Sequence, residues 1–199
     1  MRAQGFNATT VDDICAAAGV TKGGFFHYFK SKEVLAKAAI SHFSEIKSQD
    51  FKEASFRKLP DPLDRIFGRL DFVKESTGGT ANLTKGCLVG MLAQELSFTH
   101  PELRGVCQDS FSRTLKDFEA DLAEAKSVHA ADANFNPKDV AQLYVTIIQG
   151  SLMLAKASET NAVLQQNIEQ FRTYLQSLFG QSSRRSGKLT VKTSAKSRN

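Results

Sequence analysis

The stretch TVDDICAAAGVTKGGFFHYFKSKE, residues 10–33, decides the fold. Thr10 opens a capping-box pattern with an acid three residues later, which predicts the start of a short helix. Gly19 predicts the end of that helix, because glycine readily takes the left-handed conformation that follows a helical terminus. Thr21 predicts the start of a second helix and Ser31 the start of a long third one. The stretch therefore predicts two short helices joined by a tight turn, followed by a long helix.

The rest of the chain also predicts helices. Apolar residues recur at a period near 3.6, prolines stand where several segments begin, and no long strand-like alternation is present. After the opening pair, the predicted helices cover residues 31–51, 62–75, 87–99, 101–127, 138–157 and 161–179. The final segment is poor in apolar residues and has no acid, so it is predicted to be disordered. The fold class is therefore all-α.

Charge is distributed unevenly along the chain, whose net charge is +5. Residues 1–59 carry 9 Lys/Arg and 6 Asp/Glu, residues 60–180 carry 11 and 15, and residues 181–199 carry 6 and none. Basic ends around a mildly acidic middle favour a polyanionic partner for the ends. A lysine-rich tail that only improves solubility is an equal alternative.

Several classes of protein are not expected. Cys15, Cys87 and Cys107 are odd in number and widely separated, which indicates reduced thiols in a cytoplasmic protein. No apolar run approaches the roughly 20 residues of a membrane span, and no signal peptide is recognisable. The sequence has no zinc-site spacing, no phosphate-binding glycine loop and no nucleophile paired with a base. We therefore expect no membrane partner, no metal, no cofactor and no enzymatic activity.

A helix, a glycine turn and a second helix form the arrangement that places the second helix in the major groove of DNA. Two glycines follow Lys22, although each costs about 1 kcal/mol relative to alanine in a helix. Such a cost is tolerated where a bare backbone must approach a surface. Thr21 and Lys22 can reach phosphates or base edges, and His27 and Tyr28 add donors further along. Lys32, at the start of the third helix, places an ammonium and backbone N–H groups where a phosphate would bind.

The stretch from Gly5 to about Ala39 resembles the tetracycline-repressor (TetR) family of bacterial transcription regulators. The resemblance is carried by GF, ATT, the I-x-x-x-A-G-V turn, the aromatic–His–Tyr–Phe run and the K-S-K-E helix start, in this order and spacing. It implies a DNA-binding domain followed by a helical ligand-binding and dimerisation domain. The DNA contacts that it implies are Thr10, Thr21, Lys22, Gly23, Gly24, His27, Tyr28 and Lys32.

Parts of the stretch depart from that pattern. Phe26 stands where the family commonly has tyrosine, so no DNA role is assigned to it. Phe25 and Phe29 fit a buried aromatic cluster better than a DNA contact. Family members normally carry a further amphipathic helix before GF, whereas only MRAQ precedes it here. Either the start has been placed too late, or DNA binding is impaired. The second possibility leaves an alternative function, a helical ligand-binding or interaction protein; a small helical enzyme is a third.

Residues 138–157 and 161–179 predict a homodimer interface. The first of these helices is apolar around most of its circumference, so one protomer is not expected to cover it. In the family, the corresponding helices form a four-helix bundle between protomers, whose twofold symmetry matches a palindromic operator. The alternative is that both helices fill the core of a monomer.

The effector site is expected between residues 62 and 157. GCLVGMLAQEL followed by SFTHPEL resembles part of the family, including regulators that sense reactive small molecules. Cys87 stands at a predicted helix start two residues after Lys85, and helix amides and an ammonium favour the reactive thiolate. A small buried core cysteine is the more common reading of such a residue. The candidate effector-binding residues are Cys87, Met91, Phe98, His100 and Phe111. The apolar ones form a stripe that is more often plain core, and His100 is at least as typical of a helix cap. Cys107 is expected to be inert.

These expectations define three parts of the chain. Residues 1–45 are a helix-turn-helix DNA-binding domain, residues 46–180 a larger helical effector-binding and dimerisation domain, and residues 181–199 a basic disordered tail. The predicted function is that of a ligand-responsive DNA-binding transcriptional regulator. We expect a repressor that a small-molecule effector releases from a palindromic operator on double-stranded DNA.

Overall fold

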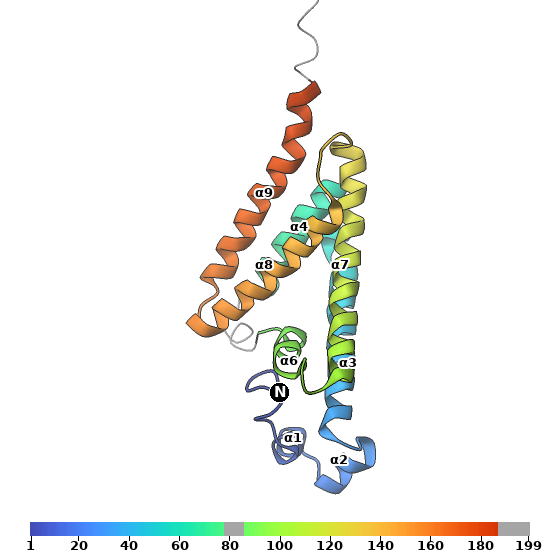
Figure 1. Cartoon of the computed structure of the whole chain (residues 1–199), viewed down its shortest axis with the longest axis vertical. Helices are drawn as coiled ribbons and strands as arrows, with labels where there is room; N and C mark the ends of the chain where they lie inside the picture. The colour runs from blue at the N-terminus through green and yellow to red at the C-terminus, as the bar shows by residue number, and fades with distance from the viewer. Residues whose placement is uncertain (78–85, 187–199) are drawn as a thin grey trace, which may run out of the picture.

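The computed structural model describes residues 1–77 and 86–186, and side chains as far as residue 180. Within these residues all regular structure is helical, which confirms the predicted fold class. A short helical pair lies at one end of the molecule, and a long helix leads away from it (Figure 1). In chain order the elements are α1 (Val11–Ala18), α2 (Lys22–Tyr28), α3 (Lys32–Glu53), the 3-10 helix η1 (Ser55–Lys58), α4 (Pro62–Ser76), α6 (Leu88–Leu96), α7 (Pro101–His129), α8 (Pro137–Ser158) and α9 (Ala162–Ser186).

The helix boundaries in the opening stretch follow from the predicted caps. The Thr10 hydroxyl accepts a bond from the N–H of Asp13 at 3.0 Å, and the Asp13 carboxylate accepts one from the N–H of Thr10 at 2.8 Å. Gly19 closes α1 in the left-handed region, with φ of 66°. Thr21 and Ser31 cap α2 and α3 through their hydroxyl groups. The helix-turn-helix is therefore encoded locally, by polar groups that satisfy the ends of each helix.

The structure refines the other predicted boundaries. α7 continues to His129, beyond the predicted end near residue 127, and η1 was not predicted. α9 continues to Ser186, which corrects the prediction that the chain becomes disordered at residue 181. The predicted loop 76–86 lies mostly outside the described residues. α3 runs without interruption through the proposed domain boundary at 45/46, so the two parts share one helix.

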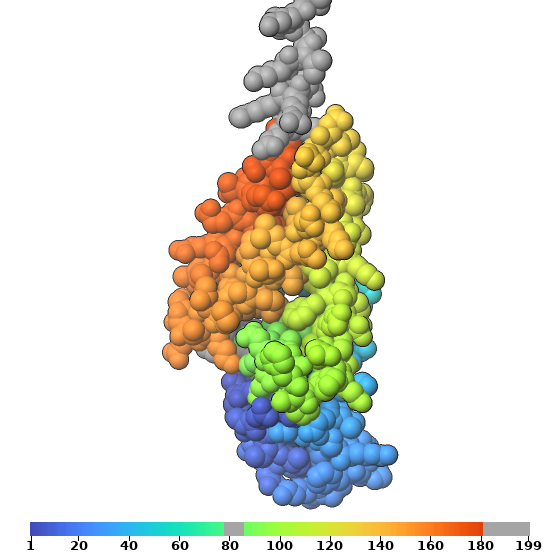
Figure 2. Space-filling model, in the orientation of Figure 1, coloured from blue at the N-terminus to red at the C-terminus, as the bar shows by residue number. Residues whose placement is uncertain are grey.

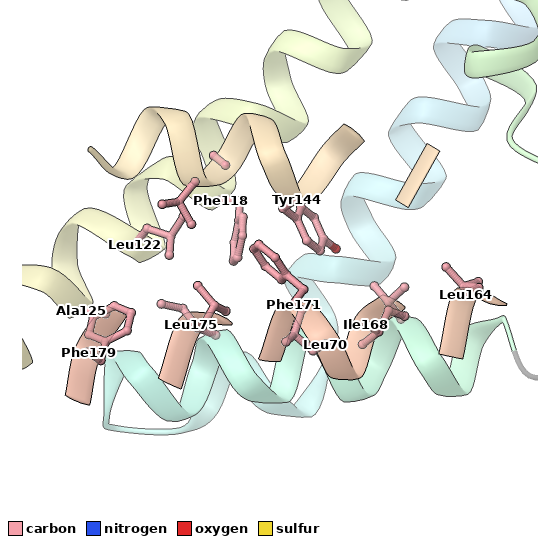
Figure 3. Packing of buried hydrophobic residues seen from close by; sticks show 14 of the residues in the cluster. Leu70, Phe118, Leu122, Ala125, Tyr144, Leu164, Ile168, Phe171, Leu175 and Phe179 are labelled. Atoms are coloured by element: carbon pink, nitrogen blue, oxygen red, sulfur yellow. The ribbon is translucent and has the colours of Figure 1, made fainter. Parts of the chain in front are cut away.

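The larger core lies between α4, α7, α8 and α9 (Figure 3). Its centre is an aromatic group in which the Tyr144 ring centroid lies 4.5 Å from that of Phe118 and 5.7 Å from that of Phe171. Fully buried aliphatic side chains surround these rings, namely Ile66, Leu70, Leu122, Leu164, Ile168 and Leu175. Each contributes about 2 kcal/mol by burial, which fixes α8 and α9 on one side of α4 and α7.

A group of four charged side chains joins η1, α4 and α7. Arg57 donates to the carboxylates of Asp117 and Asp121 at 2.7 Å each, and Arg69 donates to Asp117. Arg69 is only 1% exposed, and its Nε has no hydrogen-bond partner. Because buried charges are tolerated only when paired, this network ties the segment that follows α3 to the body of the larger domain.

A smaller core joins the two ends of the fold. Phe6, which is 2% exposed, packs with residues of α3, α6 and α7. These residues are Ala36, Ile40, Leu92, Leu96, Leu103 and Cys107. The N-terminal segment, the start of α3 and the α6–α7 corner therefore share one hydrophobic cluster. The helix-turn-helix end is consequently attached to the larger domain by packing as well as through α3.

α8 is the one helix in the described ranges that is long and apolar enough to cross a membrane, judged by length and composition alone. To that extent the prediction that no such segment exists is wrong. Core helices of globular proteins meet the same criterion. Only 28% of the apolar window of α8 is buried. A large part of its surface is therefore left uncovered by its own chain.

Candidate nucleic-acid interface

The exposed end of the molecule is built from α1 and α2, which protrude from the body of the protein (Figure 2). α2 buries Phe25, which is 4% exposed, and turns its other side chains to solvent. Lys22, His27 and Tyr28 are exposed, Tyr28 to 79%. The second helix of the pair thus presents a cationic and hydrogen-bonding surface at the tip of the fold.

Lys22 is available for a phosphate. Its ammonium lies 2.9 Å from the Asp12 carboxylate, and the two side chains are 59% and 69% exposed. An ion pair so open to solvent is worth at most about 1 kcal/mol. If Lys22 left Asp12 and paired with a DNA phosphate instead, the loss of this ion pair would therefore cost little free energy.

The two glycines at the start of α2 are not required by the interior of the protein. A Cβ on Gly23 would meet no atom closer than 3.8 Å, and one on Gly24 none closer than 3.5 Å. Neither residue has a positive φ. Alanine would fit both positions and would favour the helix by about 1 kcal/mol each. Packing inside the protein therefore does not account for the absence of side chains at these two positions.

Thr10 and Lys32 are held by internal contacts. The N–H and the hydroxyl of Thr10 both donate to the Asp13 carboxylate. Both bonds lower the pKa of this carboxyl group, and the bond from the N–H has the larger effect. The Lys32 ammonium donates to the carbonyls of Phe6 and Thr9, at 2.9 Å each. A phosphate would have to replace Asp13 as the partner of Thr10, whereas Lys32 has a third N–H to offer.

The aromatic residues divide as the sequence predicted. Phe25 is buried and Phe29 half-buried, and their ring centroids are 5.9 Å apart. Phe26 is 52% exposed on the same side of the fold as the other α2 side chains that face solvent. Its ring can make apolar contacts there, but it lacks the hydroxyl that would donate to a phosphate.

The five candidate effector residues do not gather at one place, although Cys87 and Phe111 both pack against the smaller core. Cys87 and Met91 lie at the start of α6, whereas Phe98 and His100 lie beyond its end. Phe98 is 98% exposed, so it lines no cavity. His100 occupies the N-cap position of α7 without making a capping bond, and its ring centroid lies 5.4 Å from that of Phe6. Phe111 packs on the smaller core.

A depression of about 440 Å³ lies on the surface between α3 and α7. It is lined by Ser41, Val106, Asp109, Ser112, Arg113 and Lys116. None of the five candidate residues contributes to it.

Cys87 differs from the other two cysteines in its surroundings. Cys15 and Cys107 are buried, and burial, with a smaller effect of Cys87, raises the pKa of Cys107 to about 11. Cys87 is half-buried at the N-cap of α6, where its sulfur accepts the N–H of Gly90 at 3.5 Å. Lys156 of α8 reaches the first turn of α6 and places its ammonium 3.2 Å from the sulfur of Met91. Lys85 lies outside the described residues.

The predicted dimer helices show one uncovered apolar face. Leu143, Ile147, Gly150 and Leu154 of α8 follow one another at helical spacing, and Leu143 and Leu154 are 39% and 48% exposed. A Cβ on Gly150 would meet no atom within 4 Å. α8 and α9 form one flank of the molecule in Figure 2. This face has the composition and space that a second helix pair requires.

Two residues that the sequence did not single out take part in long-range contacts. One is Lys156; the other is Glu95, whose carboxylate accepts bonds from the N–H groups of Phe6 and Asn7. Neither has a local signal, because its partners lie 65 to 89 residues away in the sequence.

Comparison with known protein families gives two matches. Residues 1–39 match the family described as bacterial regulatory proteins, tetR family. Residues 70–170 match the family described as transcriptional regulator LmrA/YxaF-like, C-terminal domain. The first match covers the helix-turn-helix and the start of α3, and the second covers most of the larger domain.

Individual relatives agree with these matches. The chain is 31% identical over 163 residues to the transcriptional regulator AcuR of Cereibacter sphaeroides, covering 77% of this chain and 69% of AcuR. It is 25% identical over 164 residues to the HTH-type transcriptional repressor DhaR of Mycobacterium sp. strain GP1, covering 82% and 80%. A TetR transcriptional regulator from Chloroflexus aurantiacus superposes with a TM-score of 0.76 at 25% identity, covering 87% of each chain. The chain therefore belongs to the TetR family of bacterial regulatory proteins and is a helix-turn-helix DNA-binding transcriptional regulator.

Proposed function

We propose that the protein is a homodimeric repressor that binds a palindromic operator through paired α2 helices and leaves it when a small molecule binds the larger domain. The observation that carries the proposal is the surface of α2. It combines exposed Lys22, His27 and Tyr28 with two glycines that the interior does not require. DhaR, of which the match covers 80%, is named a repressor. We also propose a cytoplasmic location, where the operator is found.

The dimer is supported by the uncovered face of α8. A palindrome presents two half-sites about 34–36 Å apart, and a twofold dimer matches both with one pair of helices. The apolar stripe through Leu143, Ile147, Gly150 and Leu154 continues along the same side of the helix. Its burial against a second copy would remove apolar surface from water and fix the separation of the two α2 helices.

For the effector, we propose an electrophile that reacts with Cys87. This thiol is the least buried of the three, it accepts the Gly90 N–H, and α8 brings Lys156 to the same helix turn. A Cβ on Gly90 would lie 2.2 Å from the Gln149 side chain, so the first turn of α6 lies close against this residue of α8. An adduct on the half-buried Cys87 sulfur would break its bond with the Gly90 N–H, and we propose that this shifts α6.

The DNA-binding proposal is tested by fluorescence anisotropy. An operator is selected from a random duplex library by the unaltered protein, and affinities for operator and random duplexes are measured at several salt concentrations. Loss of a base contact costs about 1–3 kcal/mol, so His27→Ala should weaken operator binding about tenfold or more. His42→Ala, which alters an exposed histidine in the middle of α3, is the matched control. Equal effects of the two substitutions would contradict the proposed role of α2.

The effector proposal has its own test. The protein on its operator is treated with N-ethylmaleimide at neutral pH, and the bound fraction is followed together with the mass of the protein. We expect the protein to leave the operator when it gains the mass of one adduct. The Cys87→Ser variant should stay bound. Release that persists in Cys87→Ser would exclude this cysteine as the sensor.

A further inference from the structure

The N-terminal arm, residues 1–9, runs beside α6 to the start of α1 (Figure 1). It is not helical, but it is ordered by its own bonds. The N–H of Gly5 donates to the carbonyl of Met1 at 2.7 Å, and the hydroxyl of Thr9 donates to the carbonyl of Gly5 at 2.6 Å. The ring of Phe6 anchors the arm in the smaller core. The arm is therefore a fixed connection between the two parts of the molecule.

One side of the arm is bound by Glu95, in the last turn of α6. One oxygen of its carboxylate accepts the N–H of Phe6 and the other accepts the N–H of Asn7, both at 2.7 Å. Bonds from two successive N–H groups to one carboxylate are charge-assisted and fix both position and direction. Gly5 has a φ of +94°, and a Cβ there would lie 2.9 Å from the Glu95 carboxylate. Glycine at this position is therefore what lets the carboxylate reach the backbone.

The other side of the arm is bound by Lys32, in the first turn of α3. The carbonyls of Phe6 and Thr9 each accept a bond from its ammonium at 2.9 Å, and the ammonium lies 4.2 Å from the centroid of the Phe6 ring. An ammonium has three N–H donors, so one remains for another acceptor. A free lysine side chain has several rotatable bonds, whereas the arm holds this one in a single arrangement before DNA arrives.

These contacts form one chain of bonds from the larger domain to the DNA-binding end. We propose that Glu95 is a positioning residue for DNA binding, which fixes the N-terminal arm and, through the arm's carbonyls, holds the Lys32 ammonium ready for a DNA phosphate. This inference rests on the proposed function. It also suggests how α6 affects DNA binding: a shift of this short helix at its Cys87 end moves Glu95 at the other end, and with it the N-terminal arm.

The test is a double-mutant cycle on operator affinity. Glu95→Gln keeps the shape of the side chain and weakens the bonds to Phe6 and Asn7. Glu102→Gln, in the exposed first turn of α7, removes the same charge close by and serves as the control. Relative to that control, Glu95→Gln should weaken operator binding about tenfold. In a Lys32→Ala background the same substitution should change affinity less than twofold, because its effect passes through Lys32.

A role in stability alone predicts a different pattern. Glu95→Gln would then act equally in both backgrounds, and equal effects would overturn the inference while leaving the proposed function intact. Equal affinities for Glu95→Gln and Glu102→Gln would overturn it as well. An unaltered protein that does not discriminate its operator from random DNA would overturn the proposed function and this inference together.

Two further measurements do not depend on the folding of Glu95→Gln. Gly5→Ala should weaken operator binding like Glu95→Gln, because its Cβ enters the space of the carboxylate. In the unaltered protein, hydrogen exchange at the amides of Phe6 and Asn7 should be at least a hundredfold slower than in an unstructured chain. Unprotected amides at both positions, or a Gly5→Ala variant with unchanged affinity, would show that Glu95 does not hold the arm.

Discussion

Substitution of Leu154 by glutamate should convert the protein to a monomer and remove operator binding. Leu143, Met153 and Leu154 of α8 are 39%, 54% and 48% exposed, and Ile147 and Gly150 continue the same surface. The exposed fractions of Leu143, Met153 and Leu154 together equal about one and a half fully exposed apolar side chains on each protomer. At about 2 kcal/mol for a fully buried side chain, a symmetric dimer would gain about 6 kcal/mol from them.

The glutamate removes part of this gain and adds a penalty. Loss of the Leu154 contribution from both protomers costs about 2 kcal/mol, and two unpaired carboxylates enter an apolar interface at a cost of several kcal/mol. A total of at least about 4 kcal/mol corresponds to a dimer that is roughly a thousandfold weaker. Operator binding should weaken accordingly, because a monomer engages only one half-site.

The assay is sedimentation equilibrium over a range of protein concentrations, combined with anisotropy on the selected operator. Val128→Glu is the matched control, since Val128 is 62% exposed near the end of α7 and outside the α8 face. It should leave both the dimerisation constant and the operator affinity unchanged. If Leu154→Glu dimerises as well as Val128→Glu, α8 does not form the interface and the reasoning fails.

Three other predictions concern single residues. Lys32→Ala should weaken binding to all duplexes and reduce the slope of log K against log salt by about one unit; an unchanged slope would show that Lys32 meets no phosphate. Phe26→Tyr restores a hydroxyl at a half-exposed position of α2 and should strengthen binding to operator and random DNA alike by about fivefold, as anisotropy would show. Because burial raises the pKa of Cys107 to about 11, the folded state keeps a proton that the unfolded chain loses near pH 9. Stability should therefore fall by about 2–3 kcal/mol between pH 9 and 11 in urea unfolding, and Cys107→Ala should lack this part of the fall.

The opening stretch could be predicted because its signals are local. Thr10, Gly19, Thr21 and Ser31 each satisfy a helix end with groups no more than a few residues away. Hydrophobic periodicity likewise placed the starts of the long helices within a few residues, although α9 continues seven residues beyond its predicted end. Such signals predict where a helix begins and which of its faces is apolar. They do not state which helices meet.

The effector residues show where local reasoning ends. Cys87 and His100 belong to one motif in the sequence, but the length of α6 separates them in space. Phe98, an aromatic residue in a predicted helical stripe, lies past the end of α6 and is almost fully exposed. A helical stripe continues only as far as the helix, and the end of α6 has no proline or glycine signal to mark it. The grouping of these residues could not be corrected without the tertiary structure.

Glu95 and Lys32 together show how the two parts of the chain depend on each other. The sequence predicted Lys32 as a phosphate contact, and the structure gives the same ammonium two carbonyl partners on the arm. Both roles can be held at once, because an ammonium has three N–H donors and the arm uses two of them. Its place is set by Glu95, from a helix whose other end carries Cys87. If the proposed roles hold, changes at Cys87 reach the DNA contacts through a nine-residue helix and one carboxylate.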